Sequence, residues 1–281
     1  MSGVLLTAGY DRAWHSVYVA ERLRRAGQAP ALILLAYPAS MGRMRTILRS
    51  RGVGSVLSYL AGREQAAPDS PMRAAVRGLG IGKPSLKAWA RRYDVPLVIV
   101  GDLNGERAVR AAARLAPKVT AYTGGGILRR GLLEAVGRRV LNAHSGPLPA
   151  VRGMNALEWS VLLGQPTGVT IHLIDEGIDT GHALEFVDVP AAAGDTLESL
   201  RERLVLAGAA GMVRWVLRAL QGDRLDMPVG VAAGPRQRQC FVVAPALREL
   251  AARRLAQRCA PSSQAPAPPV FAEFDGGAVE T

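Results

Sequence analysis

The sequence predicts an α/β fold: a doubly wound, mostly parallel sheet of the Rossmann-like kind, with helices on both faces. Two observations carry this prediction. Continuous apolar runs of strand length occur at residues 31–37 and 95–104, as expected for strands that are buried on both faces. Segments with helical spacing separate such runs, and this alternation is typical of a parallel sheet. The length of 281 residues suits one large domain or one domain with an appendage.

The expected elements follow one another along residues 1–190, which we take as the main domain. Strands are expected at 3–8, 31–37, 95–104, 118–123, 138–144, 168–175 and 184–189. Helices are expected at 13–26, before Leu115, at 128–136 and at 155–164. In a sheet of this kind, binding sites lie at the carboxyl ends of the strands.

Residues 41–92 interrupt this rhythm with a strongly basic composition. The segment has two acidic residues, Glu64 and Asp69. It has eleven Lys or Arg residues, at positions 43, 45, 49, 51, 63, 73, 77, 83, 87, 91 and 92. Helical spacing at 44–48 and 53–60 predicts a helical insertion with a basic outer face, which could cap a site, bind an anionic partner or simply be solvated. The net charge of +12 likewise fits either an anionic partner or a solvated surface. Because no basic patch interleaved with aromatic residues accompanies the charge, we favour a solvated surface over a nucleic-acid partner.

Residues 191–259 are expected to form a small C-terminal extension. A long amphipathic helix is predicted at 196–220, with Asp195 or Thr196 as its N-cap, followed by short strands within 227–243 and a last helix at 246–259. Residues 260–281 are rich in Pro, Ala and Ser, a composition typical of disordered tails.

The composition indicates a cytoplasmic protein without a membrane span. No run reaches the ~18 apolar residues that suggest a membrane helix. The N-terminal segment lacks the basic start and the cleavage site of a signal peptide. With Cys240 and Cys259 as the two cysteines, no disulfide framework and no cysteine-rich metal site is expected.

Two polar residues end the apolar run at 138–144. Asn142 and His144 are two apart, so on a strand their side chains point to the same face. An Asn amide donates to an oxygen that gains negative charge, and an imidazole donates or handles a proton near neutral pH. Pro147 and Pro149 stiffen the loop that follows. The pair alone is weak evidence, since a strand end followed by a turn explains it equally well.

A carboxylate further along the chain completes the candidate site. Asp179 stands in the turn 175–181, 37 residues beyond Asn142, and after one helix and one strand it can return to the same rim. A carboxylate beside His144 would favour the imidazolium and fix its tautomer. An ordinary turn aspartate remains the alternative. Together the three residues suggest acyl transfer or hydrolysis without a covalent nucleophile, because no G-x-S-x-G motif is present.

The stretch LNAHSGPLPAVRGMNALEWSVLLGQPTGVTIHLIDEGIDTGHAL, residues 141–184, resembles the catalytic domain of folate-dependent formyltransferases. These comprise the glycinamide ribonucleotide, methionyl-tRNA and sugar N-formyltransferases. The resemblance implies 10-formyltetrahydrofolate as donor, no metal, and direct attack of an amine on the formyl carbon. It implies that Asn142 and His144 stabilise the oxyanion, and that Asp179 keeps His144 charged and helps to move the proton.

The resemblance also implies a folate pocket at matching positions: Gly125, Gly126, Ile127, Leu128, Val140, Glu176, Gly177 and Ile178. For Ile127, Leu128 and Val140, ordinary core packing is the alternative. The loop at 7–16 has one glycine and a bulky Tyr10 where purine enzymes have a Gly-rich phosphate loop, which weakens a ribonucleotide acceptor. The expected acceptor is therefore the amine of a small molecule. A methionyl-tRNA formyltransferase-like enzyme, a formyltetrahydrofolate hydrolase and a non-catalytic binding protein remain alternatives, and the oligomeric state stays open.

Overall fold

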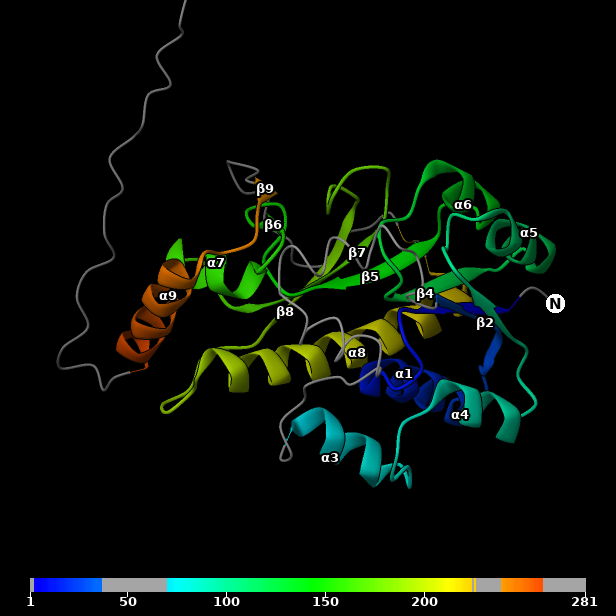
Figure 1. Ribbon diagram of the computed structural model, residues 1–281, viewed down its shortest axis with the longest axis horizontal. Coiled ribbons are helices and arrows are strands. Elements are labelled where there is room, and N and C mark those ends of the chain that lie inside the picture. Colours follow the sequence, from blue (N-terminus) through cyan, green and yellow to red (C-terminus); the bar gives the residue numbers. More distant parts are fainter. Residues whose placement is uncertain (1–2, 37–69, 224, 226–238, 260–281) are drawn as a thin grey trace, which may run out of the picture.

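A seven-stranded sheet forms the centre of the computed structural model, which describes residues 3–36, 70–223, 225 and 239–259 (Figure 1). Its strands lie in the order β3-β2-β1-β4-β5-β7-β8. Their bounds are β1 Val4–Ala8, β2 Pro30–Ala36, β3 Leu97–Val100, β4 Val119–Thr123, β5 Val140–His144, β7 Gly168–Leu173 and β8 Ala183–Asp188. The first five run parallel, whereas β7 runs antiparallel between β5 and β8. The predicted mostly parallel α/β fold is confirmed.

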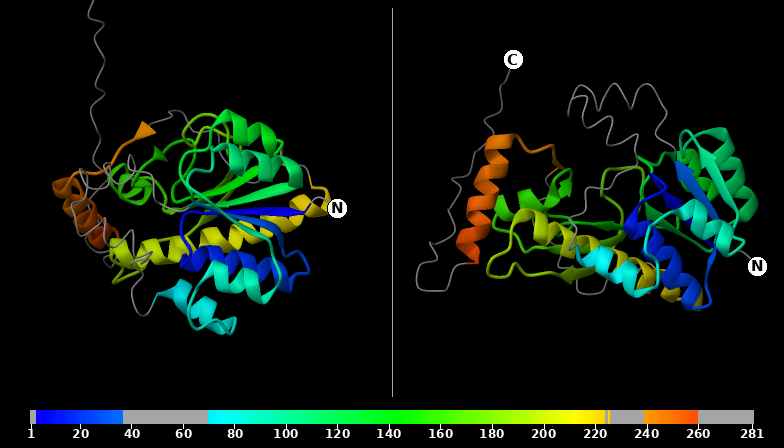
Figure 2. Two further views of the ribbon diagram at one scale, coloured as in Figure 1. Left: turned by 45° about the vertical axis from the view of Figure 1, so that its right-hand side comes forward. Right: turned by 60° about the horizontal axis from the view of Figure 1, so that its bottom comes forward.

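Helices cover both faces of the sheet, as Figure 2 shows. One face carries α1 Trp14–Arg25, α3 Pro71–Gly78, α4 Leu86–Arg92 and α8 Leu197–Gln221, and the other carries α5 Glu106–Leu115 and α6 Arg130–Ala135. Side chains alternate between the two layers, because successive residues of a strand point to opposite faces. Leu6 thus packs with the α1 and α8 layer, and Leu5 with the α5 and α6 layer.

The described part of the basic segment consists of α3 and α4. Met72, Val76 and Trp89 are buried, so both helices pack on the core through their apolar sides. Arg77 and Arg91 are exposed on their outer sides. The helices expected at 44–48 and 53–60 lie outside the described residues.

The long helix α8 lies across the sheet face beside α1. Thr196 caps it by accepting from the backbone of Ser199, as the sequence predicts. Among the described residues it is the one helix whose length and apolar composition would allow a membrane span, a test that the core helix of a folded domain passes equally. Here it packs its apolar side, including Leu200, Leu204 and Trp215, into the core.

The C-terminal extension returns to the main domain. Helix α9 (Pro245–Arg258) packs against α7 (Ala156–Leu162), and the short strand β9 (Gln239–Cys240) pairs in parallel with β6 (Arg152–Gly153). The short strands expected within 227–243 are thus described at β9, while residues 226–238 and the expected tail at 260–281 lie outside the described residues.

Candidate active site

Strands β5 and β7 bring three polar side chains to one face of the sheet. Asn142 and His144 are two residues apart on β5, and the antiparallel register sets His172 of β7 directly opposite Asn142. Asn142 Nδ2 lies 3.0 Å from His172 Nε2. Thr170, opposite His144, accepts from the backbone of Leu148 and donates to Gly146 O, which fixes the loop after β5.

The turn after β7 carries Asp179 back to these residues. Its Oδ2 lies 3.3 Å from His144 Nδ1 and accepts from the backbone N–H of Gly153 at 2.8 Å, while its Oδ1 lies 3.7 Å from His172 Nε2. Asp179 adopts a left-handed φ of 52°, a conformation that Asp tolerates better than most residues. The structure therefore brings together the three residues that the sequence singles out.

Both ring nitrogens of His144 have a partner. Its Nε2 lies 2.9 Å from Val151 O, and because a carbonyl oxygen only accepts, Nε2 carries a hydrogen. Its Nδ1 faces the carboxylate of Asp179. His144 is thus held by a carbonyl on one ring nitrogen and a carboxylate on the other, with its side chain 8% exposed.

His172 is a neutral imidazole whose tautomer is fixed. Its Nδ1 lies 2.8 Å from Leu173 O and therefore donates to it, which leaves Nε2 as an acceptor for the amide of Asn142. Burial lowers the pKa of His172 to about 4, with the charge of His144 adding to this and that of Asp179 opposing it. The acceptor at Nε2 turns the Asn142 amide so that its nitrogen faces His172.

Reading the sequence missed His172. Its position in an alternating strand is the usual signal of a structural residue. Its part in the site follows from the pairing of β5 with β7, which sets it level with Asn142. The local pattern of the sequence carries no signal of this pairing.

A cavity of about 420 Å³ opens beside Asn142, His172 and Asp179. Of the positions implied for folate binding, Gly126, Ile127, Leu128, Gly177 and Ile178 line it. The other three lie outside its lining. Val140 is fully buried in the core between the sheet and α6, Gly125 packs against Leu103, and Glu176 points outward to Arg138.

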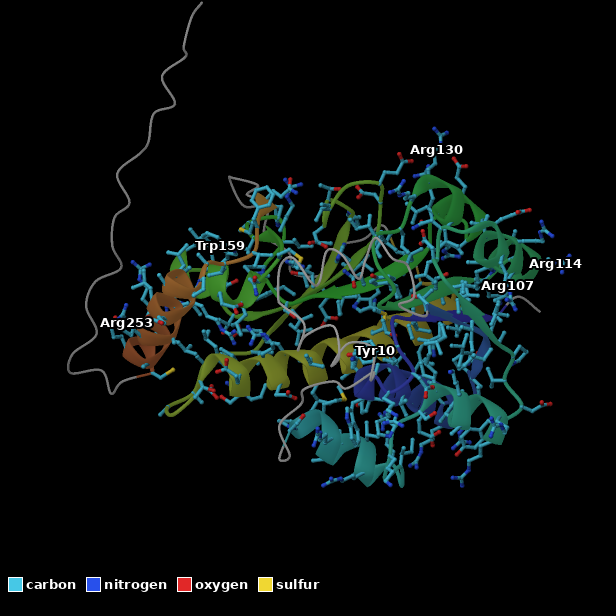
Figure 3. The ribbon with its side chains drawn as sticks, in the orientation of Figure 1. Tyr10, Arg107, Arg114, Arg130, Trp159 and Arg253 are labelled. Atoms are coloured by element: carbon cyan, nitrogen blue, oxygen red, sulfur yellow. The ribbon has the colours of Figure 1, made fainter. Side chains whose placement is uncertain are left out.

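The C-terminal strand β9 (Gln239–Cys240) and the adjoining Phe241 form a wall of this cavity, which sequence reasoning also missed. Three hydrogen bonds tie the segment to the main domain: Met154 N donates to Cys240 O, Trp159 Nε1 to Phe241 O, and Val243 N to Asn155 Oδ1. Figure 3 labels Trp159, which lies on α7 close to this strand.

Gly153 allows this close approach. It has a φ of 93°, and a Cβ there would lie 2.3 Å from Cys240 O, so only glycine fits. The C-terminal strand and Asp179 thus meet on the two sides of one residue. Within the part of the chain that the structure describes, no group of three or more His, Cys, Asp or Glu is arranged to hold a metal ion.

Comparison with known proteins finds formyltransferases. Residues 106–216 match the family model for formyl transferase. This segment is what the chain shares with the formyltransferase family. The methionyl-tRNA formyltransferase of Anaeromyxobacter dehalogenans (strain 2CP-1) is 39% identical over 164 residues, which cover 57% of this chain and 51% of that protein. The chain therefore spans about half the length of the curated relatives that it matches.

Solved structures of formyltransferases share the fold. The phosphoribosylglycinamide formyltransferase from Anaplasma phagocytophilum superposes with a TM-score of 0.56 at 16% identity, over 85% of this chain and 99% of that one. An N-formyltransferase from Helicobacter canadensis, in complex with folinic acid and dTDP-3-aminofucose, gives a TM-score of 0.50 at 16% identity, over 79% and 65%. At these identities the likeness concerns the fold.

Proposed function

We propose that the protein transfers a formyl group from 10-formyltetrahydrofolate to the primary amine of a small molecule. The observation that carries the proposal is that Asn142 and Asp179 line one cavity and His144 contacts Asp179, within the segment 106–216 that matches the formyl transferase family model.

The 420 Å³ cavity has the walls that a folate needs. Apolar side chains line it, and two of them are exposed at its rim, Ile127 by 70% and Phe241 by 69%. Exposed apolar side chains around a cavity are typical of sites for flat aromatic ligands, which cover them on binding. The carboxylate of Asp175 and the amide of Gln239 add polar partners for ring heteroatoms. When bound, 10-formyltetrahydrofolate supplies the formyl group and leaves as tetrahydrofolate.

Asn142 is the proposed donor to the formyl oxygen. Its amide gives one hydrogen to His172, and the other is directed to the oxygen that gains negative charge when the amine attacks. Loss of one such donor typically costs about 3 kcal/mol of transition-state stabilisation. His144, kept positive by Asp179, adds to the positive potential at the same place.

Asp179 is the proposed acceptor of the proton that the amine releases, directly or through a water molecule. The new bond joins the amine nitrogen to the formyl carbon, the bond from that carbon to the folate N10 breaks, and the released proton ends on N10. The carboxylate lines the cavity, and its side chain is 15% exposed, so the attacking amine can reach it.

The variant Asp179→Asn tests this proposal by removing only the charge. Asn keeps an oxygen that accepts from Gly153 and tolerates the left-handed backbone, so the fold is retained. We expect kcat to fall by about 10²- to 10³-fold, and His144→Ala to fall comparably, with folinic acid binding largely unchanged. Incubation with 10-formyltetrahydrofolate and a panel of amines, with mass spectrometry of the formyl adduct, provides the measurement. Asp188→Asn, on the exposed end of β8, is the charge-matched control. Near wild-type turnover of Asp179→Asn would sink the assignment.

Aminoacyl-tRNA is the second candidate acceptor, because the curated relative above acts as a methionyl-tRNA formyltransferase. The exposed Arg77 and Arg91 of α3 and α4 would favour such a polyanion. Retention of tRNA that weakens steeply with rising salt supports it, and salt-insensitive behaviour without retention rules against it. Formate release without any amine would instead indicate water as the acceptor, as in the hydrolases of this fold.

A further inference from the structure

A second cavity, of about 250 Å³, lies between the sheet and the helices α1 and α8. These two helices lie side by side against the sheet in Figures 1 and 2. Ala143 and Ser145, which alternate along the chain with Asn142 and His144, line this cavity. Asn142 and Tyr122 line both cavities, so the second cavity meets the donor cavity at the residue proposed to bind the formyl oxygen.

The body of this second cavity is apolar. Helix α8 contributes one of its faces, with large side chains at Leu204, Val205 and Met212 and small residues between them at Gly208 and Ala209. Because the central residues are small, the helix leaves volume against the sheet instead of filling it. Val19 of α1 and Val169 of β7 close the apolar walls. None of the described residues that line it is Lys, Arg, Asp or Glu.

Polar groups gather at the end of the cavity near the strand ends. His15 Nε2 donates to Thr123 O at 2.8 Å, and the hydroxyl of Thr123 donates to Thr7 O at 2.7 Å. Ser145 and Asn142 lie at the same end. The cavity therefore has one polar end, which it shares with the catalytic face, and one apolar end, between α8 and the sheet.

We propose that this cavity holds the acceptor, and that the acceptor is a primary amine on a small, apolar, uncharged body. The inference rests on the proposed formyl transfer and names its substrate class. The amine lies at the polar end, beside Asn142, where it meets the formyl carbon, and the apolar body lies against α8. Burial of the apolar body is favourable. A carboxylate or phosphate buried at the same place would lose its hydration without gaining a cation from the described walls.

Two amino-acid esters with the same nucleophile separate the possibilities. Leucine methyl ester carries an apolar side chain, and glutamate α-methyl ester carries a carboxylate on a chain of similar length. We expect kcat/KM for formylation to be at least about tenfold higher for the leucine ester, which is the usual scale of discrimination by an apolar pocket. Binding of each ester is also measured by calorimetry in the presence of folinic acid, which does not depend on turnover.

Neighbouring alanines of α8 provide a matched pair of variants. Ala209→Leu places a larger side chain in the cavity, whereas Ala210→Leu adds the same side chain at a position that does not line it. We expect Ala209→Leu to weaken leucine ester binding about tenfold or more, with folinic acid binding unchanged, and Ala210→Leu to behave as wild type. Val205→Phe, nearer the helix start, is a second filling variant should Ala209→Leu fail to fold.

The outcomes separate the two proposals. The apolar acceptor site is overturned if the enzyme prefers the glutamate ester. It is also overturned if the wild type and both filling variants bind the leucine ester equally. Neither result contradicts formyl transfer itself. If the wild type binds the leucine ester and Ala209→Leu does not, the cavity is supported. If, in addition, no amine gives a formyl adduct, the proposed reaction is refuted. No binding of the leucine ester at all overturns the acceptor site.

Discussion

Replacement of His172 by Gln should remove a pH dependence of stability that arises from burial of its imidazole. Burial lowers the pKa of His172 from the ordinary 6.5 to about 4. The folded state therefore keeps this ring neutral, while in the unfolded chain it binds a proton as the pH falls through 6.5. The unfolded state thus binds more protons between the two values, and stability falls as the pH falls across that window.

The size of the effect follows from the two pKa values. Their difference corresponds to about 3 kcal/mol when the pH reaches about 4, and to about 2 kcal/mol at pH about 5. Above pH about 6.5 the contribution is absent, since both states are neutral. Gln carries no charge at any of these pH values, and its side-chain oxygen is available to accept from Asn142, so the contact with the catalytic amide has a replacement.

Urea unfolding at several pH values between about 7 and about 4 measures this difference. We expect the free energy of unfolding of the wild type to fall relative to His172→Gln by the amounts above. His182→Gln removes an exposed histidine and should follow the wild type. A difference between wild type and His172→Gln that stays constant over this range would refute the neutral, buried state of His172.

Two further changes probe the core and the donor cavity. Glu21→Gln should destabilise the protein by about 2 kcal/mol near neutral pH. Hydrogen bonds from Arg24, Arg25 and Trp89 hold the pKa of this buried carboxylate at about 2. Solvent screens the partly exposed arginines, which makes the free energy smaller than the full pKa shift implies. The wild type should lose that advantage only below pH about 4.5, as urea unfolding in acid will show. Phe241→Ala should weaken folinic acid binding about tenfold in calorimetry. Thermal stability should change little, since the ring is exposed at the cavity rim. Unchanged binding would show that the segment at β9 does not contact the folate.

The sequence predicts most strands and helices because their signals are local. Buried parallel strands such as β2 are continuous apolar runs, and Thr196 marks the start of α8 within its own capping box. Asn142 and His144 are found for the same reason, as polar residues at the end of an apolar run. Asp179 follows from the turn chemistry of its glycine-flanked loop.

The remaining parts of the site depend on pairings between distant segments. His172 matters because β7 pairs with β5 in one register, and a shift of one residue would point its side chain to the α8 face. Cys240 and Phe241 matter because β9 pairs with β6, 87 residues earlier along the chain. Local patterns of hydrophobicity carry no information on either register, so the sequence could not place these residues.

The reversal of β7 explains why the site needs its glycine-rich turn. Because β7 is antiparallel to β5, its pairing with β5 runs from His144 to Leu141, away from the strand end where the chemistry is proposed. The chain must therefore turn back at once to return Asp179 to His144. At Gly181 a Cβ would lie 1.9 Å from Leu173 O, so the returning chain passes too close to β7 for any side chain. The antiparallel strand thus supplies His172 to the site, and the tight turn that it imposes supplies the carboxylate.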